Sequence, residues 1–171
     1  TMPTAGYTAE PDYGSEWWGS GVENQHCTAV TMPEAGRITR IGVWLRGKDA
    51  SCSFRGVVWN STRNTVLGQT ALQTAPGAAL AIGASLKYEA AVATPFDVAA
   101  GTIYVGFTRN PTGAMQFGFD NTGSHYDDDN DSSNPSGMGG ESLHSGLRMG
   151  VYVVYEVGSE TYVRRSGAGS K

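Results

Sequence analysis

The sequence predicts an all-β protein, an antiparallel β-sandwich of jelly-roll type with about eight strands. Apolar and polar residues alternate along much of the chain, as they do in strands with one buried face. Combinations of Gly, Pro, Asn and Asp that form turns, such as "PEAG", "STRNT", "RNPTG" and "DNTG", separate the alternating runs. Only 16% of residues are charged and 24 are glycines, which favours short strands and tight turns over long surface helices.

In the first half of the chain, two runs alternate clearly and two are weaker strand candidates. In "RITRIGVWLRG", Ile41 and Leu45 share one face and Trp44 takes the other. In "SCSFRGVVWN", Phe54 lies on the face opposite to Trp59. The weaker candidates are "NQHCTAVTM" and "VLGQTALQT". All four are expected to be strands of the sandwich.

The second half opens with one segment that does not alternate and continues with four that do. "APGAALAIGASL" is bracketed by glycines, so we expect a loop with one helical turn. The strands that follow are expected in "SLKYEAAVA", "TIYVGFTRN", "AMQFGFD" and "LRMGVYVVYEVG". The residues expected to point into the core are Leu86, Tyr88, Ala90, Val92, Ile103, Val105, Phe107, Met115, Phe117, Phe119, Leu147, Met149, Val151, Val153, Tyr155 and Val157.

The 171 residues fit one domain, because a chain of this size buries roughly 70% of the surface that it exposes when unfolded. We expect an N-terminal arm over 1–14, the sandwich over 15–158 and a C-terminal tail over 159–171. The arm contains Tyr7 and Tyr13, and aromatic rings supply contact area at a low entropic cost. Two alternatives follow: the arm docks onto a partner subunit, or it packs on its own domain.

The charge of the chain argues against two classes of partner. The formal net charge is -4, and the 12 Lys and Arg residues are scattered instead of forming a basic stripe. No run approaches the roughly 18 apolar residues that a membrane-spanning helix requires. We therefore expect neither a nucleic-acid partner nor a membrane partner.

Motifs of catalysis are missing from the sequence. There is no G-x-S-x-G, H-E-x-x-H or C-x-x-C pattern, so we expect no enzyme and no catalytic residue. His26 is expected to be a half-buried, hydrogen-bonded strand residue, and zinc between His125 and His144 would need further ligands, for which Cys27 and Cys52 are the only soft candidates. These cysteines are either two buried free thiols or one disulfide bridge.

The acidic stretch "HYDDDNDSSNPSGMGG" leaves two interpretations open. Asp127, Asp129 and Asp131 reproduce the D-x-D-x-D start of a calcium loop, in which alternate side chains face one cation. The sharp-turn glycine and the bidentate glutamate of such a loop are missing. The stretch is therefore either a polar loop at the tip of the sandwich or a weak Ca2+ site formed by the three aspartates with Asp120. We expect no other cofactor.

Five aromatic residues are candidates for ligand binding: Trp17, Trp18, Trp44, Trp59 and Tyr126. Neighbours in a strand face opposite ways, so one of Trp17 and Trp18 is expected to face outward. Trp44 and Trp59 lie on the faces opposite to the aliphatic residues of their strands and would lie close together if those strands paired. Flat rings beside polar groups stack on sugars, which predicts a glycan platform; the alternative is packing in an interface or core.

Three phrases carry a resemblance to a known group of proteins. They are "GRITRIGVWLRG", "VVWNSTRNTVLGQT" and "ATPFDVAAGTIYVGF", within a likeness that spans roughly residues 15 to 157. Their order resembles the jelly-roll modules of virion proteins of tailed phages, notably small minor tail proteins of phages that infect actinobacteria. Similar phrases occur in carbohydrate-binding modules of secreted bacterial enzymes.

The resemblance implies a non-enzymatic structural or adhesive component on the exterior of a phage particle. Such a protein would contact other virion proteins and host cell-surface glycan. It would form a homo-oligomer, because symmetric copies add avidity to a weak contact. Two alternatives stay open: a capsid decoration protein whose arm clamps neighbouring shell subunits, and a carbohydrate-binding module of a secreted enzyme.

Overall fold

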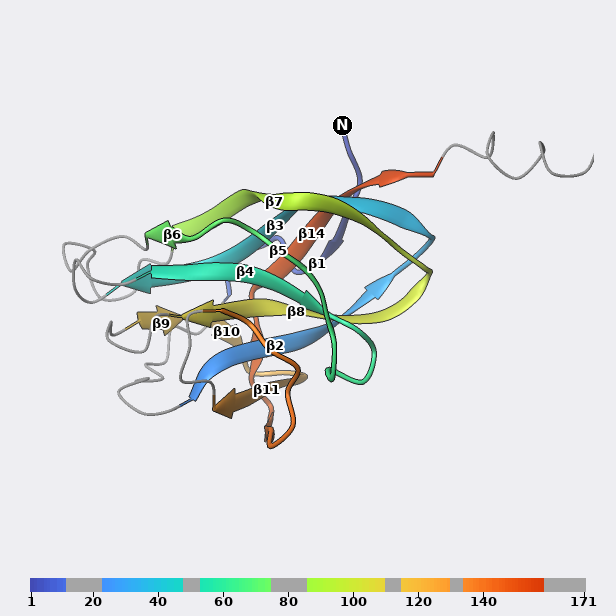
Figure 1. Ribbon diagram of the computed structural model, residues 1–171. Helices are drawn as coiled ribbons and strands as arrows, with labels where there is room; N and C mark the ends of the chain where they lie inside the picture. Colours follow the sequence, from blue (N-terminus) through green and yellow to red (C-terminus); the bar gives the residue numbers. More distant parts are fainter. Residues whose placement is uncertain (12–22, 48–52, 75–85, 110–114, 130–133, 159–171) are drawn as a thin grey trace, which may run out of the picture.

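The structure is a computed structural model that describes residues 1–11, 23–47, 53–74, 86–109, 115–129 and 134–158 (Figure 1). Within these ranges the chain forms antiparallel strands and no helix, which confirms the all-β sandwich. Several predicted features lie outside the described residues: Trp17, Trp18, Cys52, Asp131, Tyr13, the tail 159–171 and nearly all of "APGAALAIGASL".

Two sheets form the layers of the sandwich. The first, the β3 sheet, has the order β1 (Thr4–Gly6), β14 (Val151–Val157), β3 (Gly36–Gly47) and β7 (Leu86–Val98), and β9 (Met115–Phe117) also pairs with β3. The second, the β2 sheet, has the order β12 (Ser142–Ser145), β11 (Ser124–Asp129), β2 (Glu23–Met32), β8 (Gly101–Arg109), β4 (Ser53–Trp59) and β5 (Val66–Gln69), and β6 (Gln73–Thr74) pairs with β4. A short separate pair joins β10 (Phe119–Asp120) to β13 (Arg148–Met149).

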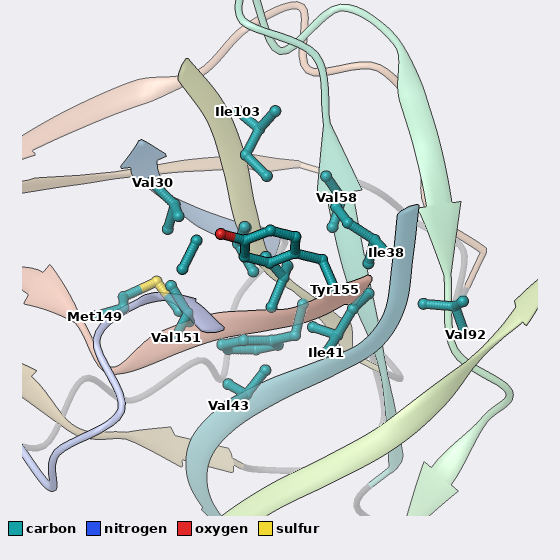
Figure 2. Close-up of a cluster of buried hydrophobic side chains, with 14 of the residues drawn as sticks. Val30, Ile38, Ile41, Val43, Val58, Val92, Ile103, Met149, Val151 and Tyr155 are labelled. Atoms are coloured by element: carbon teal, nitrogen blue, oxygen red, sulfur yellow. The ribbon is translucent and has the colours of Figure 1, made fainter. Parts of the chain in front are cut away.

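The main core fills the space between the sheets (Figure 2). Ile41, Val43 and Leu45 of β3 are fully buried, as their alternation predicted. The β2 sheet supplies the facing side chains, among them Val58 and Ile103. Burying an aliphatic side chain of this size contributes about 1.5–3 kcal/mol, so this layer of contacts holds the two sheets together.

A second, smaller cluster lies on the outer face of the β2 sheet. Cys27, Val57 and Trp59 pack there against Met138, which comes from the segment after β11. The amide of Met138 donates a hydrogen bond to the carbonyl of Arg63 at 2.9 Å. The segment 134–141 therefore covers part of this outer face.

Two predicted strands are interrupted at glycines. Gly118 separates β9 from β10, and Gly150 separates β13 from β14. The amide of Gly150 donates to the carbonyl of Gly118 at 3.2 Å, and the amide of Trp44 donates to the carbonyl of Gly150 at 2.9 Å. Val157, which was expected to point inward, is 48% exposed, because it lies at the end of β14 where the core stops.

The beginning of the predicted arm belongs to the sandwich. β1 pairs with β14, and the amide of Tyr7 donates to the carbonyl of Val151 at 2.7 Å. The Tyr7 ring packs against the core and lies 3.9 Å from the guanidinium carbon of Arg148. Of the two alternatives for the arm, packing on its own domain therefore holds for Thr4–Gly6 and Tyr7.

Candidate functional site

All three histidines of the chain converge with one aspartate at an edge of the β2 sheet. His26 lies on β2, His125 and Asp127 on β11, and His144 on β12. Asp127 is opposite His26 in the β2–β11 register, and His125 is opposite His144 in the β11–β12 register. Because side chains two apart in a strand point the same way, all four groups share the inner face of the sheet. We call them the His–Asp cluster.

The groups of the His–Asp cluster are close together and mostly buried. Potential ligand atoms of His26, His125 and Asp127 lie within 4.8 Å of one another. These residues are 2%, 0% and 1% exposed. The Nε2 atom of His144 lies 2.7 Å from Oδ2 of Asp127, and the side chain of His144 is 23% exposed. His144 therefore lies on the solvent side of the cluster. Its ring stacks on that of His125, with centroids 4.6 Å apart.

Aromatic rings form the inner wall of the cluster. The imidazole of His26 lies 5.2 Å from the ring of Phe107 and 5.1 Å from that of Phe117, measured between centroids. Phe117 also contacts His125, with centroids 5.4 Å apart. Such a wall excludes water and disfavours charge on the imidazole of His125.

The protonation of His125 follows from its surroundings. Burial lowers the pKa of His125 to about 4, although the hydrogen bond to Leu147 acts in the opposite direction. Its Nδ1 lies 3.0 Å from the carbonyl oxygen of Leu147. A carbonyl only accepts, so Nδ1 carries the proton and Nε2 holds the lone pair of a neutral ring.

The predicted calcium site does not assemble around Asp127 and Asp120. Asp127 points inward to the histidines, whereas Asp128 accepts a hydrogen bond from the amide of Gly139 at 3.0 Å. Asp120 forms an ion pair with Arg148. The described residues show no oxygen-rich group of the kind that Ca2+ needs, since the His–Asp cluster offers mainly nitrogen. Asp127 and Asp120 thus have other neighbours, and because Asp131 lies outside the described residues, the Ca2+ site as a whole stays a prediction.

Trp44 and Trp59 lie in different sheets, so the strand pairing that would have brought them together does not occur. Trp59 is fully buried in the second cluster, and its Nε1 donates to the carbonyl oxygen of Ser136 at 2.8 Å. Its ring offers no exposed face for a sugar, because the segment 134–141 covers it. Trp44 is half-buried on the outer face of the β3 sheet.

Charged and aromatic groups extend from Trp44 along the outer face of the β3 sheet. The Lys87 ammonium lies 5.9 Å from the Trp44 ring and 5.8 Å from the Tyr152 ring. The Tyr152 hydroxyl donates to Glu89 at 2.7 Å, and Glu89 pairs with Arg40 at 2.7 Å. These five residues form the Trp44 surface. Pro11, the last described residue before the segment with Trp17 and Trp18, lies beside Trp44 at Gly150.

Tyr126 lies on the outer face of the β2 sheet in a second polar–aromatic group. The guanidinium carbon of Arg63 lies 3.9 Å from the centroid of the Tyr126 ring and 4.7 Å from that of Tyr104. Arg63 also pairs with Glu141 at 2.7 Å, and both of these side chains are mostly buried. The face of Tyr126 is thus occupied by a guanidinium of the same chain.

Sequence reasoning considered His125 and His144 together but missed His26 and Asp127 as their neighbours. The only local signal is the pattern His125–Tyr126–Asp127, in which the first and third side chains share a face. His26 and His144 join them only through the pairing of β11 with β2 and β12, which no local spacing encodes. Asp127 was assigned instead to a polar tip or a weak Ca2+ site because of its acidic neighbours.

Comparisons with known proteins do not place the chain in a family. No protein-family model matches it, and no curated protein matches it significantly. The described residues include no helix of the length and apolarity needed to cross a membrane.

Proposed function

We propose that the chain is a non-enzymatic jelly-roll module on the exterior of a tailed-phage particle, a minor tail protein that contacts other virion proteins and binds host-surface glycan. The Trp44 surface is the observation that carries the binding role. A half-buried indole lies there near the ammonium of Lys87, and the Arg40–Glu89 ion pair lies farther along the same sheet face. Sugars bind at such places through C–H contacts with the ring and hydrogen bonds with the polar groups.

The strand order supports the jelly-roll part of the proposal. One layer runs β1-β14-β3-β7, and the strands β2-β8-β4-β5 are consecutive in the other layer. The chain moves back and forth between the layers, from β1 to β2 to β3 to β4 and later from β7 to β8. A double Greek key gives this kind of interleaved order.

The capsid-decoration alternative loses part of its basis. It depended on an arm that clamps a neighbouring shell subunit, but Thr4–Gly6 is a strand of the β3 sheet of its own domain. Deleting 1–14 would therefore remove a strand as well as an arm. We do not put this alternative forward.

An array of bacterial cell-wall glycans tests the binding role. Trp44→Ala is expected to weaken binding roughly ten-fold, which corresponds to about 1.4 kcal/mol. Leu143→Ala is the matched control, because it removes an exposed apolar side chain from β12 of the other sheet. Thermal unfolding of each variant would check that the fold is kept. No binding by the wild-type chain, or equal binding by Trp44→Ala, would contradict the proposal.

Immunogold labelling of the phage particles tests the location. Antibodies against the chain are expected to label the tail. Labelling of the capsid shell alone would reject the tail assignment in favour of decoration. Particles without label, from a preparation in which a known tail protein is labelled, would reject the virion assignment altogether.

A further inference from the structure

We propose that the His–Asp cluster binds one divalent transition-metal ion, zinc being the best match, through His26, His125, Asp127 and His144. This site is independent of the Trp44 surface and of any glycan. It would use three imidazole nitrogens and one carboxylate oxygen. The following steps derive it from spacing, orientation and donor chemistry.

The spacing of the donor atoms is close to that of a bound ion. Zinc–nitrogen and zinc–oxygen bonds of about 2.0–2.2 Å place neighbouring tetrahedral donors about 3.4 Å apart. Donor atoms of His26, His125 and Asp127 lie within 4.8 Å of one another, and His144 lies 2.7 Å from Asp127. In the proposed site His144 completes the set of four donors from the side of Asp127, at the partly exposed edge of the cluster.

The orientation of His125 is typical of a metal ligand. Histidines that bind metals usually donate their other ring N–H to a carbonyl or carboxylate, which fixes the tautomer. The Nδ1 atom of His125 lies 3.0 Å from the carbonyl oxygen of Leu147, so Nδ1 carries the proton and Nε2 carries the lone pair that would bind the ion.

The donor set selects the class of ion. Ca2+ takes six to eight oxygen ligands and Mg2+ prefers oxygen in an octahedron, so neither matches a site with three imidazoles. Imidazole suits Zn2+, Cu2+, Ni2+ and Fe2+. The thiol of Cys27 lies on the opposite face of the sheet, 3.5 Å from the sulfur of Met138, so it does not join the donors. Four nitrogen and oxygen donors are the usual tetrahedral set of zinc.

The position of the cluster indicates a structural role for the ion. β11 and β12 extend the β2 sheet beyond β2, and β12 is its edge strand. An ion bound to His26, Asp127 and His144 would cross-link all three strands. Because the ion binds the folded chain, its binding free energy adds to the stability of the fold.

The experiment uses the whole chain without a polyhistidine tag, freed of metal by a chelator that is then removed. Zn2+ is titrated by calorimetry, and Co2+ is titrated by visible absorption, since tetrahedral Co2+ with nitrogen and oxygen ligands absorbs intensely. We expect saturation at one equivalent and a rise in the unfolding temperature with Zn2+. A chain with no saturable Co2+ band and no shift of unfolding temperature with Zn2+ would overturn the proposal.

Variants assign the ligands. Asp127→Asn and His144→Gln are each expected to lower the affinity for Zn2+ at least ten-fold and to weaken the Co2+ band. His144 is the most exposed of the four, so His144→Gln keeps the test valid if Asp127→Asn does not fold. Asp128→Asn, one residue away on the opposite face, is the matched control and should bind as the wild type does. Unchanged affinity in His144→Gln, or equal loss in Asp128→Asn, would overturn the assignment.

Discussion

The indole Nε1 of Trp59 donates a 2.8 Å hydrogen bond to the carbonyl oxygen of Ser136. This bond joins the end of β4 to a segment far along the chain, on the outer face of the β2 sheet. Met138 of the same segment lies beside Trp59 in the second cluster. The ring and its hydrogen bond together hold 134–141 against the sheet.

Trp59→Phe is therefore expected to cost about 1–3 kcal/mol, because the substitution removes the hydrogen bond to the Ser136 carbonyl and part of the buried ring. Trp44→Phe is the control, since Nε1 of Trp44 is buried and has no hydrogen-bond partner among the described residues. Urea unfolding followed by circular dichroism measures both. An equal loss of stability in the two variants would show that the Ser136 bond contributes little.

Gly42→Ala is expected to destabilise the β3 sheet by roughly 1–3 kcal/mol, as overpacking in a tight site does. A Cβ atom at Gly42 would overlap the ring of Tyr152, which lies flat over this position. Gly139→Ala is the matched control, because a Cβ atom there meets nothing within 4 Å. Thermal unfolding of both variants is the measurement, and a wild-type melting curve for Gly42→Ala would contradict the packing described for Tyr152.

Acid is expected to weaken the Trp44 surface through Glu89. The hydrogen bond from Tyr152, followed by that from Arg40, lowers the pKa of Glu89 below its ordinary value of 4.5. A carboxyl whose pKa is lower in the folded state stabilises the fold above its unfolded pKa, and this contribution is lost as the pH falls through the folded pKa. Urea midpoints measured at neutral pH and below pH 4.5 should therefore fall less in Glu89→Gln than in the wild type. An equal fall of the urea midpoint in Glu89→Gln and in the wild type would refute this prediction.

The thiol of Cys27 is expected to resist alkylation in the folded chain. Burial raises its pKa, with a smaller opposing influence of Arg63, so the reactive thiolate is scarce. Iodoacetamide labelling followed by peptide mass spectrometry measures the reaction at Cys27 apart from any at Cys52. Labelling of Cys27 should begin only when urea unfolds the chain. Rapid labelling under native conditions would show that the second cluster opens readily.

The sequence was a good guide where alternation and burial agree. Ile41, Val43 and Leu45 were placed correctly because apolar side chains occupy the inner face of β3 and polar or aromatic ones the outer face. β2 was underrated as a strand, because its buried positions include Gln25, His26 and Thr28. Buried polar side chains look like surface residues to any pattern based on hydrophobicity alone.

Features that depend on the pairing of segments far apart in the sequence could not be predicted. The segment 134–141 buries Trp59, but its only buried apolar side chain is Met138. Its composition is therefore typical of a solvated loop. The His–Asp cluster depends in the same way on β11 lying between β2 and β12. Sequence spacing carries no record of either arrangement, since loop closure can bring together any two segments of this length.

The neighbouring positions of β1 and β14 have a mechanical consequence. Thr4 is opposite Val154, and the amide of Tyr155 donates to the carbonyl of Pro3 at 3.1 Å, so the chain enters β1 and leaves β14 at the same end of the sheet (Figure 1). Tension applied between these two points would break the hydrogen bonds between β1 and β14 one after another, instead of shearing all of them at once. Carrier proteins attached at both points would sit side by side and leave the far end of the sandwich unobstructed.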